Sequence, residues 1–379
     1  MTRVFNLAEE LAERQLSLED AAQKSGIPLE RLRSVAAGAE LSLSELRQLS
    51  AALKLPLRTL KSKRQKSPDL QVLFRRGLHD IDASKQRVID ALAREVAAVF
   101  DIAAGLPSNT DWIEEFPQVP QTKDDAGLIA ALFRQKYFDD DQNSPFLSLA
   151  EVVSDELGVH VIIAPDLPIE GASVRLNNHA FVLLAPRSFR PRMLFTLAHE
   201  LGHFVAQHHA NAPEFANLDF ENDIGSWHAP RRPLEAFADS FASALLLPAP
   251  AVAMAIQTFR EMQKISDAEP LGDIEISLVA RFFGVSFEVA GRRCEDLGLL
   301  RRGAARAIYE KVTEEHKSPE KRAEEVGLPP RPDLSFGTSK RLLKAAAAKI
   351  QSGEISTGRA AEALHVTISD LFAANVGTK

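Results

Sequence analysis

The sequence predicts an α+β protein that is mainly helical and contains one small β-sheet. Apolar residues recur at helical spacing through most of the chain, which favours amphipathic helices. Two short runs rich in β-branched residues, 159–164 and 180–184, favour strands instead, and a weaker strand lies near 172–175. Because Asn177 and Asn178 form a turn signal between the last two runs, we expect a meander of about three strands.

Charged and proline-containing stretches, at 61–69, 106–126 and 317–335, interrupt the helical pattern and are typical of linkers. We therefore expect five segments, a helix-turn-helix bundle at 1–64, a helical connector and linker at 65–125, a sheet-containing domain at 126–303, a linker at 304–338 and a C-terminal helical unit at 339–379. A length of 379 residues is typical of two or three domains, which agrees with this division.

The composition excludes several classes of protein. The net charge of −7 argues against a protein that coats nucleic acid over its whole surface, and the single cysteine, Cys294, excludes an intramolecular disulfide framework. No run reaches the roughly 18 apolar residues of a membrane helix, and the first residues lack the apolar run of a signal peptide. We expect a cytoplasmic protein with no membrane segment.

The N-terminal segment differs from the rest in charge. Residues 1–66 hold 12 Lys and Arg against 8 Asp and Glu, so 12 − 8 = +4 on an otherwise acidic chain. Five of these bases stand close together, namely Arg58, Lys61, Lys63, Arg64 and Lys66. Contact with phosphates and a solvated linker explain this run equally well.

A spacing pattern occurs near both ends of the chain. Five residues of the first copy recur at identical spacing in the second, Ser17, Ala21, Ala22, Ile27 and Leu32 as Ser356, Ala360, Ala361, Val366 and Leu371. A small pair lets two helices approach closely, and the aliphatic residue after the turn fills their junction. This pattern is typical of a helix-turn-helix.

The central motif is FTLAHELGHF at 195–204. His199 and His203 are four residues apart, so on a helix both imidazoles project from one face and can bind one metal ion. Glu200 follows the first of them and can reach a water molecule in the remaining coordination position. This is the H-E-x-x-H pattern of zinc peptidases.

The segment EAFAD at 235–239 adds two carboxylates about one helix later. Catalytic zinc usually has three protein ligands, and Glu235 can supply the third. Asp239 lies one turn further on and can orient an imidazole by accepting its second N–H. Two His and one carboxylate suit Zn²⁺, although Mn²⁺ and Fe²⁺ also occupy such sites.

Residues 127–303 resemble the ImmA/IrrE family of metallopeptidases through these two motifs, the strands before them and LVARFFGVSFEVAGRRCEDLGLL at 278–300. The resemblance implies a zincin-like domain with His199, His203 and Glu235 as zinc ligands and Glu200 as the catalytic residue. It also implies that an extended peptide pairs with a strand edge within 180–184. Phe237 departs from the family pattern, because a second acidic residue is common at its position.

Residues 6–62 resemble the XRE-type helix-turn-helix of bacterial and phage repressors. The recognition helix would be 28–35, and candidate DNA contacts are Arg31, Arg33, Ser34, Arg58, Lys61, Lys63 and Arg64. A protein-interaction module that does not bind DNA is the alternative. DNA binding implies a homodimer, because such domains usually bind two half-sites.

Two functions follow from these features. The first is a zinc-dependent regulatory metallo-endopeptidase that cleaves a transcriptional repressor or antitoxin and is directed by its own DNA-binding domain. The second is a DNA-binding transcriptional regulator whose metallopeptidase-like domain senses a ligand or metal. Glu200 favours the first, since sensing needs no general base, and the fused N-terminal segment favours the second.

Overall fold

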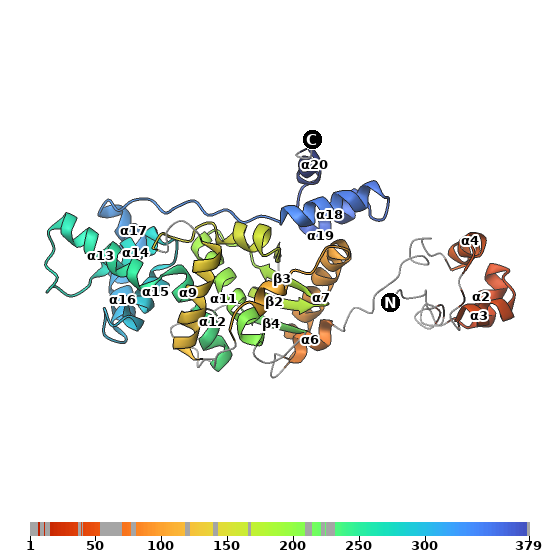
Figure 1. Ribbon diagram of the computed structural model, residues 1–379, viewed down its shortest axis with the longest axis horizontal. Coiled ribbons are helices and arrows are strands. Elements are labelled where there is room, and N and C mark those ends of the chain that lie inside the picture. Colours follow the sequence, from red (N-terminus) through yellow and green to blue (C-terminus); the bar gives the residue numbers. More distant parts are fainter. Residues whose placement is uncertain are drawn as a thin grey trace. The chain divides into compact units, whose positions relative to one another are not determined.

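The computed structural model describes residues 7, 11, 16–36, 39, 41–53, 70–76, 81–117, 122–138, 143–165, 168–208, 214–220, 224 and 232–376. The chain divides into a unit at Met1–Pro68 and a larger unit at Asp69–Lys379 (Figure 1). The predicted α+β architecture, mainly helical with a small sheet, is confirmed.

The smaller unit contains the helices α2 (Leu18–Ser25), α3 (Leu29–Ala36) and α4 (Leu43–Ala52). Ser17 caps α2 by accepting a hydrogen bond from the Asp20 amide, and Gly26 ends the helix with a positive φ of 73°. Ala21, Ile27 and Leu32 of the repeated pattern are buried in one cluster that also includes residues of α4. The repeated spacing therefore places these three residues in the core where α2 packs against α3.

Within the described residues, the larger unit contains four strands and most of the helices. The strands are β1 (His160–Ile163), β2 (Ile169–Leu176), β3 (His179–Leu184) and β4 (Phe215–Phe220). The helices before β4 are α6 (Leu70–Arg76), α7 (Ala83–Ala103), α8 (Asp111–Glu114), α9 (Lys123–Tyr137), α10 (Leu149–Glu151), the π-helix η1 (Val152–Glu156) and α11 (Arg190–His208). The helices after β4 are α12 (Pro233–Leu246), α13 (Ala249–Gln263), α14 (Asp273–Phe282), α15 (Phe287–Asp296), α16 (Ala304–His316), α17 (Pro319–Glu325), α18 (Lys340–Gln351), α19 (Thr357–Leu364) and α20 (Ile368–Val376).

The sheet has the order β1-β3-β2-β4. β1 is parallel to β3, while β2 is antiparallel to both β3 and β4. The expected three-stranded meander is therefore wrong in two respects. A crossover separates β1 from β2, and β4 adds a fourth strand that is not among the three strands expected from the sequence.

Helices cover both faces of the sheet. On one face the core includes Val182, Leu201 and Phe241 and joins the sheet to α9, α11 and α12. On the other face Val174 and Phe181 pack in a second cluster with α6, α7 and the C-terminal helices. The sheet is thus buried on both sides, and α11 lies between it and α12.

The segments expected as connector and C-terminal unit are part of this same body. Leu92 and Val96 of α7 share a buried cluster with the sheet and with Leu342 of α18. His365 contacts Glu95 of α7 at 2.8 Å between Nε2 and Oε2. The helices of both segments thus belong to the body that contains the sheet.

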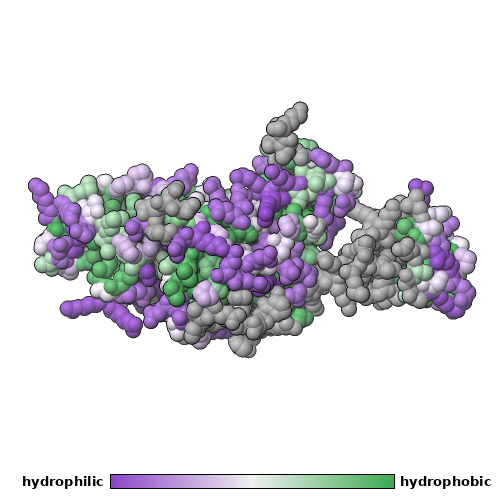
Figure 2. Space-filling view, viewed as in Figure 1, coloured by the Kyte–Doolittle hydropathy of each residue, from purple (hydrophilic) through white to green (hydrophobic). Residues whose placement is uncertain are grey.

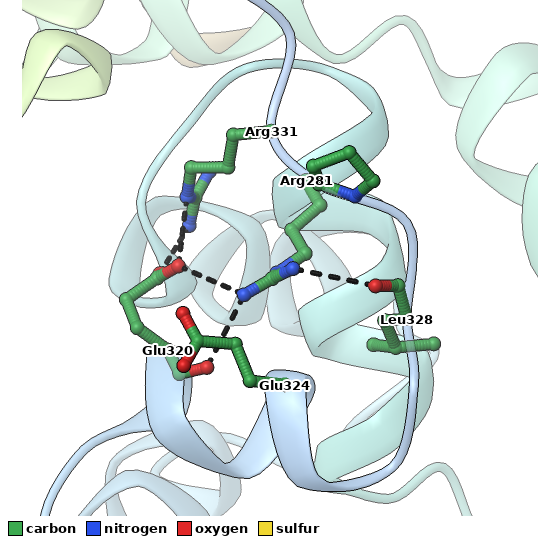
Figure 3. A pocket seen from close by; sticks show the side chains of 6 residues that line it. Arg281, Glu320, Glu324, Leu328 and Arg331 are labelled. Atoms are coloured by element: carbon green, nitrogen blue, oxygen red, sulfur yellow. Dashed lines mark hydrogen bonds and ion pairs between the residues drawn. The ribbon is translucent and has the colours of Figure 1, made fainter.

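The expected linker at 304–338 contains α16 and α17 and is fixed to α14 (Figure 3). Arg281 of α14 donates to the carbonyl oxygen of Pro329 at 2.9 Å and lies 3.5 Å from the Glu320 carboxylate. Arg331 forms an ion pair with Glu320 and donates to the carbonyl oxygen of Ala280 at 3.0 Å. The charged residues that resemble a linker here form a partly buried network.

Hydrophilic residues occupy much of the face seen in Figure 2, and hydrophobic residues show in separate areas between them. Within the described residues no single helix has the length and apolar character needed to cross a membrane. Only α12 and α13 taken together meet those two conditions, and a bend of 49° separates them.

Candidate metal centre

The H-E-x-x-H motif lies in a part of helix α11 whose side chains are buried. Leu197, Leu201 and Phe204 fill the core beside it, and His199 and His203 are 1 % and 0 % exposed. Because the two imidazoles are one turn apart, their Nε2 atoms face each other at 3.0 Å. The helix therefore presents two nitrogen donors at one point.

The helix α12 brings two carboxylates to the same point. Pro233 begins this helix, and Glu235 lies in its first turn. Oε2 of Glu235 is 3.3 Å from Nε2 of His199 and 3.4 Å from Nε2 of His203. One turn later, Oδ1 of Asp239 is 2.8 Å from Nδ1 of His199. Asp239 is thus placed to accept the second N–H of that imidazole.

A glycine allows the two helices to approach closely. A Cβ atom on Gly202 of α11 would lie 2.8 Å from Cα of Ala238 and 3.2 Å from its Cβ. Ala238 lies between Glu235 and Asp239 in the sequence. The distance from the imidazoles to both carboxylates therefore depends on this contact.

Asp219 on β4 is a further member of the cluster that the sequence motifs do not reveal. Its Oδ2 atom lies 3.7 Å from Nε2 of His199 and 3.6 Å from Nε2 of His203, and the residue is 4 % exposed. The donor atoms of His199, His203, Asp219 and Glu235 all lie within 4.8 Å of one another. In the sequence, Asp219 is one of several carboxylates between the two motifs, and its position there does not distinguish it from the others.

Glu200 lies against strand β2 beside this cluster. It is fully buried, and neither carboxylate oxygen has a hydrogen-bond partner in the described part of the chain. Gly171 of β2 makes room for it, because a Cβ there would overlap the Glu200 carboxylate. Burial, together with the charge of Asp219, raises the pKa of Glu200 to about 8.

Three metal-donor residues of the cluster also have shifted pKa values, namely His199, His203 and Glu235. Burial opposes the charged form of His203, but the carboxylates of Asp219 and Glu235 outweigh it and raise the pKa of His203 to about 9. Burial and the same carboxylates act likewise on His199, whose pKa is raised. Burial also opposes the charge of Glu235, yet the two imidazoles hold its pKa well below the usual range.

The donor set fits a divalent transition metal. Donors bound at about 2.0–2.1 Å around a tetrahedral ion lie about 3.3–3.4 Å apart. The imidazole and carboxylate separations of 3.0, 3.3, 3.4, 3.6 and 3.7 Å come close to this value. Oδ2 of Asp219 and Nδ1 of His203 are also buried without a hydrogen-bond partner. A cation here would offset the cost of burying these carboxylates.

Residues 154–295 match the peptidase M78 family, described as the IrrE N-terminal-like domain. The match covers less than half of the 379 residues and includes every residue of the metal centre. It supports the metallopeptidase domain that the motifs predict. No curated protein matches the chain.

The expected substrate edge within 180–184 is not available. β3 lies between β1 and β2 and pairs with both, so its main-chain groups are already used. The expectation is wrong because the sequence does not reveal that β1 runs parallel to β3. His208, His209 and His228 follow the motif in the sequence and are candidates to stabilise an oxyanion. The side chain of His208 and all of His209 and His228 lie outside the described residues.

The candidate DNA contacts of the smaller unit are only partly described. Nε of Arg31 donates to Glu45 of α4 at 2.7 Å, and Nη1 of Arg33 donates to Glu30 at 2.7 Å. The hydroxyl of Ser34 donates to the carbonyl oxygen of Arg31 at 2.8 Å. The remaining candidates lie outside the described residues, namely Arg58, Lys61, Lys63 and Arg64.

Proposed function

We propose that this protein is a zinc-dependent regulatory metallo-endopeptidase that cleaves a helix-turn-helix transcriptional repressor or antitoxin. One observation carries the proposal. The donor atoms of His199, His203 and Glu235 converge in a buried cluster, with the unpartnered carboxylate of Glu200 beside them. A domain that matches a peptidase family surrounds this cluster.

Each residue has a distinct role in the proposed reaction. A zinc ion held by His199, His203 and Glu235 would polarise a scissile carbonyl and lower the pKa of a water molecule. Glu200 accepts a proton from the attacking water and delivers it to the amine that leaves when the peptide C–N bond breaks. Asp239 accepts the Nδ1–H of His199 and so keeps Nε2 free to bind the metal.

The smaller unit is proposed to bind DNA and to bring the peptidase to a DNA-bound substrate. Support comes from the tight packing of α2 and α3, where Ala21, Ile27 and Leu32 form one buried cluster. For Arg31 to contact a base, it would have to leave Glu45, and Arg33 would have to leave Glu30. DNA binding through this unit would make a homodimer the expected assembly.

The second candidate function is a transcriptional regulator in which the metal domain senses a ligand or the metal itself. Asp219 is the observation that favours it, because a fourth protein donor is typical of a structural zinc site rather than a catalytic one. Glu200 favours the peptidase, because a buried carboxylate that no hydrogen bond satisfies is costly in a site that only senses.

A comparison of the wild-type protein with the Glu200→Gln variant distinguishes the peptidase from the sensor. The variant keeps all three metal ligands, so it should retain wild-type zinc content and lose cleavage. New protein N-termini, measured across the proteome under stress, should form with wild type and not with the variant. A regulated promoter that still responds to stress in the variant would contradict the peptidase and favour the sensor.

A further inference from the structure

We propose that Asp219 is a fourth protein ligand of the metal and that strand β4 thereby holds the peptidase in a latent state. This inference rests on the proposed metallopeptidase, and it assigns Asp219 a role that the three-ligand site does not contain. The reactive form would arise when the Asp219 carboxylate leaves the metal.

The pairing of β4 with β2 fixes the direction of the Asp219 side chain. Asp219 is directly opposite Gly171 in an antiparallel register. Residues opposite each other in a sheet point to the same face, and the missing Cβ of Gly171 faces Glu200 and Thr196 of α11. The carboxylate of Asp219 therefore also points towards α11, where the metal donors lie.

The neighbours of Asp219 confirm that β4 is held in this register. Ala216 and Leu218 point to the opposite face and belong to the core shared with α7. Phe215 points to the α11 side, where its ring centroid is 5.4 Å from that of Phe204. A shift by one residue would place Leu218 at the metal and Asp219 in an apolar core.

The distances place Asp219 in the role of a ligand. Its Oδ2 atom lies at nearly equal distances from the two imidazoles, 3.7 Å from His199 and 3.6 Å from His203. These values are close to the about 3.3–3.4 Å that separates donors of a tetrahedral zinc ion. Oδ2 is buried without a hydrogen-bond partner in the described part of the chain, and its nearest charge partners there are these two imidazoles, which are themselves metal donors.

A fourth ligand has a chemical consequence. Catalytic zinc keeps one position for water or substrate, whereas four protein ligands close the site. With Asp219 bound, Glu200 would have no water molecule from which to accept a proton. Asp219 and a water molecule thus compete for one coordination position, and Glu200 can act as a base only after Asp219 has left that position.

β4 also occupies the edge to which a substrate would add. An extended peptide commonly binds by pairing with the edge of a sheet. The edge of β2 next to the metal is paired along most of its length with β4, from Arg175 opposite Phe215 to Ile169 opposite Phe220. β4 therefore resembles a bound peptide whose Asp219 side chain takes the place of water at the metal.

The test uses the full-length protein loaded with Co²⁺, whose visible absorption reports coordination, and acetohydroxamate as a probe that needs an open position. The wild-type spectrum should stay unchanged as acetohydroxamate is added, whereas the spectrum of Asp219→Asn should shift. The Zn²⁺ dissociation constant, measured by chelator competition, should rise by at least about 10-fold in Asp219→Asn. Asp155→Asn is the matched control, since Asp155 pairs with Lys340 away from the metal centre.

The outcomes distinguish this inference from the proposed function. A wild-type spectrum that shifts with acetohydroxamate overturns the inference even if Asp219→Asn does not fold, while bound Co²⁺ still supports the metal centre. Absence of metal binding in wild type overturns both. If Asp219→Asn opens the site but generates no new N-termini that depend on Glu200, the ligand role stands and the peptidase function fails.

Discussion

The substitution Gly202→Ala tests whether the spacing of α11 and α12 sets the metal centre. The added Cβ would lie 2.8 Å from Cα of Ala238, whereas ordinary contacts begin at 3.4 Å. The helices must therefore separate locally by about 3.4 − 2.8 = 0.6 Å. Metal–ligand distances tolerate only about 0.2 Å. Because Ala238 lies between Glu235 and Asp239, both carboxylates should move away from the imidazoles.

Two measurements report this movement. The Zn²⁺ dissociation constant should rise by about 10- to 100-fold, as when a residue that supports a metal ligand is lost. Overpacking costs about 1–3 kcal/mol, and the higher helix propensity of Ala returns about 1 kcal/mol, so the metal-free protein should lose up to about 2 kcal/mol. Chelator competition measures the first value and urea unfolding the second.

The control is Gly127→Ala in α9. A Cβ on Gly127 meets no atom within 4 Å, so this substitution adds helix propensity without a clash. Gly127→Ala should keep wild-type zinc affinity and gain up to about 1 kcal/mol of stability. If Gly202→Ala matches Gly127→Ala in both measurements, the spacing of the helices does not control the metal centre and the reasoning fails.

Three further substitutions address single contacts. Asp239→Ala removes the acceptor for Nδ1 of His199 and should weaken zinc binding by about 10- to 100-fold in chelator competition, with little change in helical content. Gly171→Ala would displace the Glu200 carboxylate, so peptide cleavage should fall by up to about 100-fold while zinc content is kept. Burial lowers the pKa of His160 in the folded protein to about 3 from 6.5. As the pH falls, His160 takes up a proton in the unfolded chain before it does so in the folded protein. The contribution of neutral His160 to the free energy of unfolding is therefore fully present above about pH 6.5 and is lost as the pH falls towards 3. In urea unfolding, the metal-free His160→Phe variant should lack up to about 5 kcal/mol of this loss, and an unchanged pH dependence would exclude His160 as its source.

The metal ligands on α11 and α12 could be predicted because their geometry is local. A separation of four positions on a helix places the side chains of His199 and His203 on the same face before any tertiary contact forms. The pair Glu235 and Asp239 has the same internal spacing, and Pro233 marks the start of their helix. The family resemblance supplies the one long-range fact, that the second helix faces the first.

The role of the charged stretches could not be predicted from the sequence. Proline and charge at 317–335 indicate a linker, because such residues are usually solvated. In the structure Arg331 donates to the backbone carbonyl oxygen of Ala280 in α14 and pairs with Glu320. Charge composition does not reveal whether a guanidinium has found buried acceptors, since that depends on a helix far away in the sequence.

Strand β4 shows the same limit at the site itself. The sequence FANLDF lies in a stretch rich in proline, asparagine and aspartate, and its last five residues, 216–220, alternate between apolar and polar. So short an alternation is a weak strand signal among so many turn-forming residues. Both faces of β4 meet the protein interior. On one face it packs Ala216 and Leu218, and on the other it brings Asp219 to the imidazoles. A single aspartate forms no sequence pattern, and Asp219 reaches the metal donors only because β4 pairs with β2 so that Asp219 lies opposite Gly171.

If this pairing holds a fourth donor at the metal, a search for substrates with the wild-type protein alone would underestimate its activity. Asp219→Asn is then the variant in which to look for cleavage.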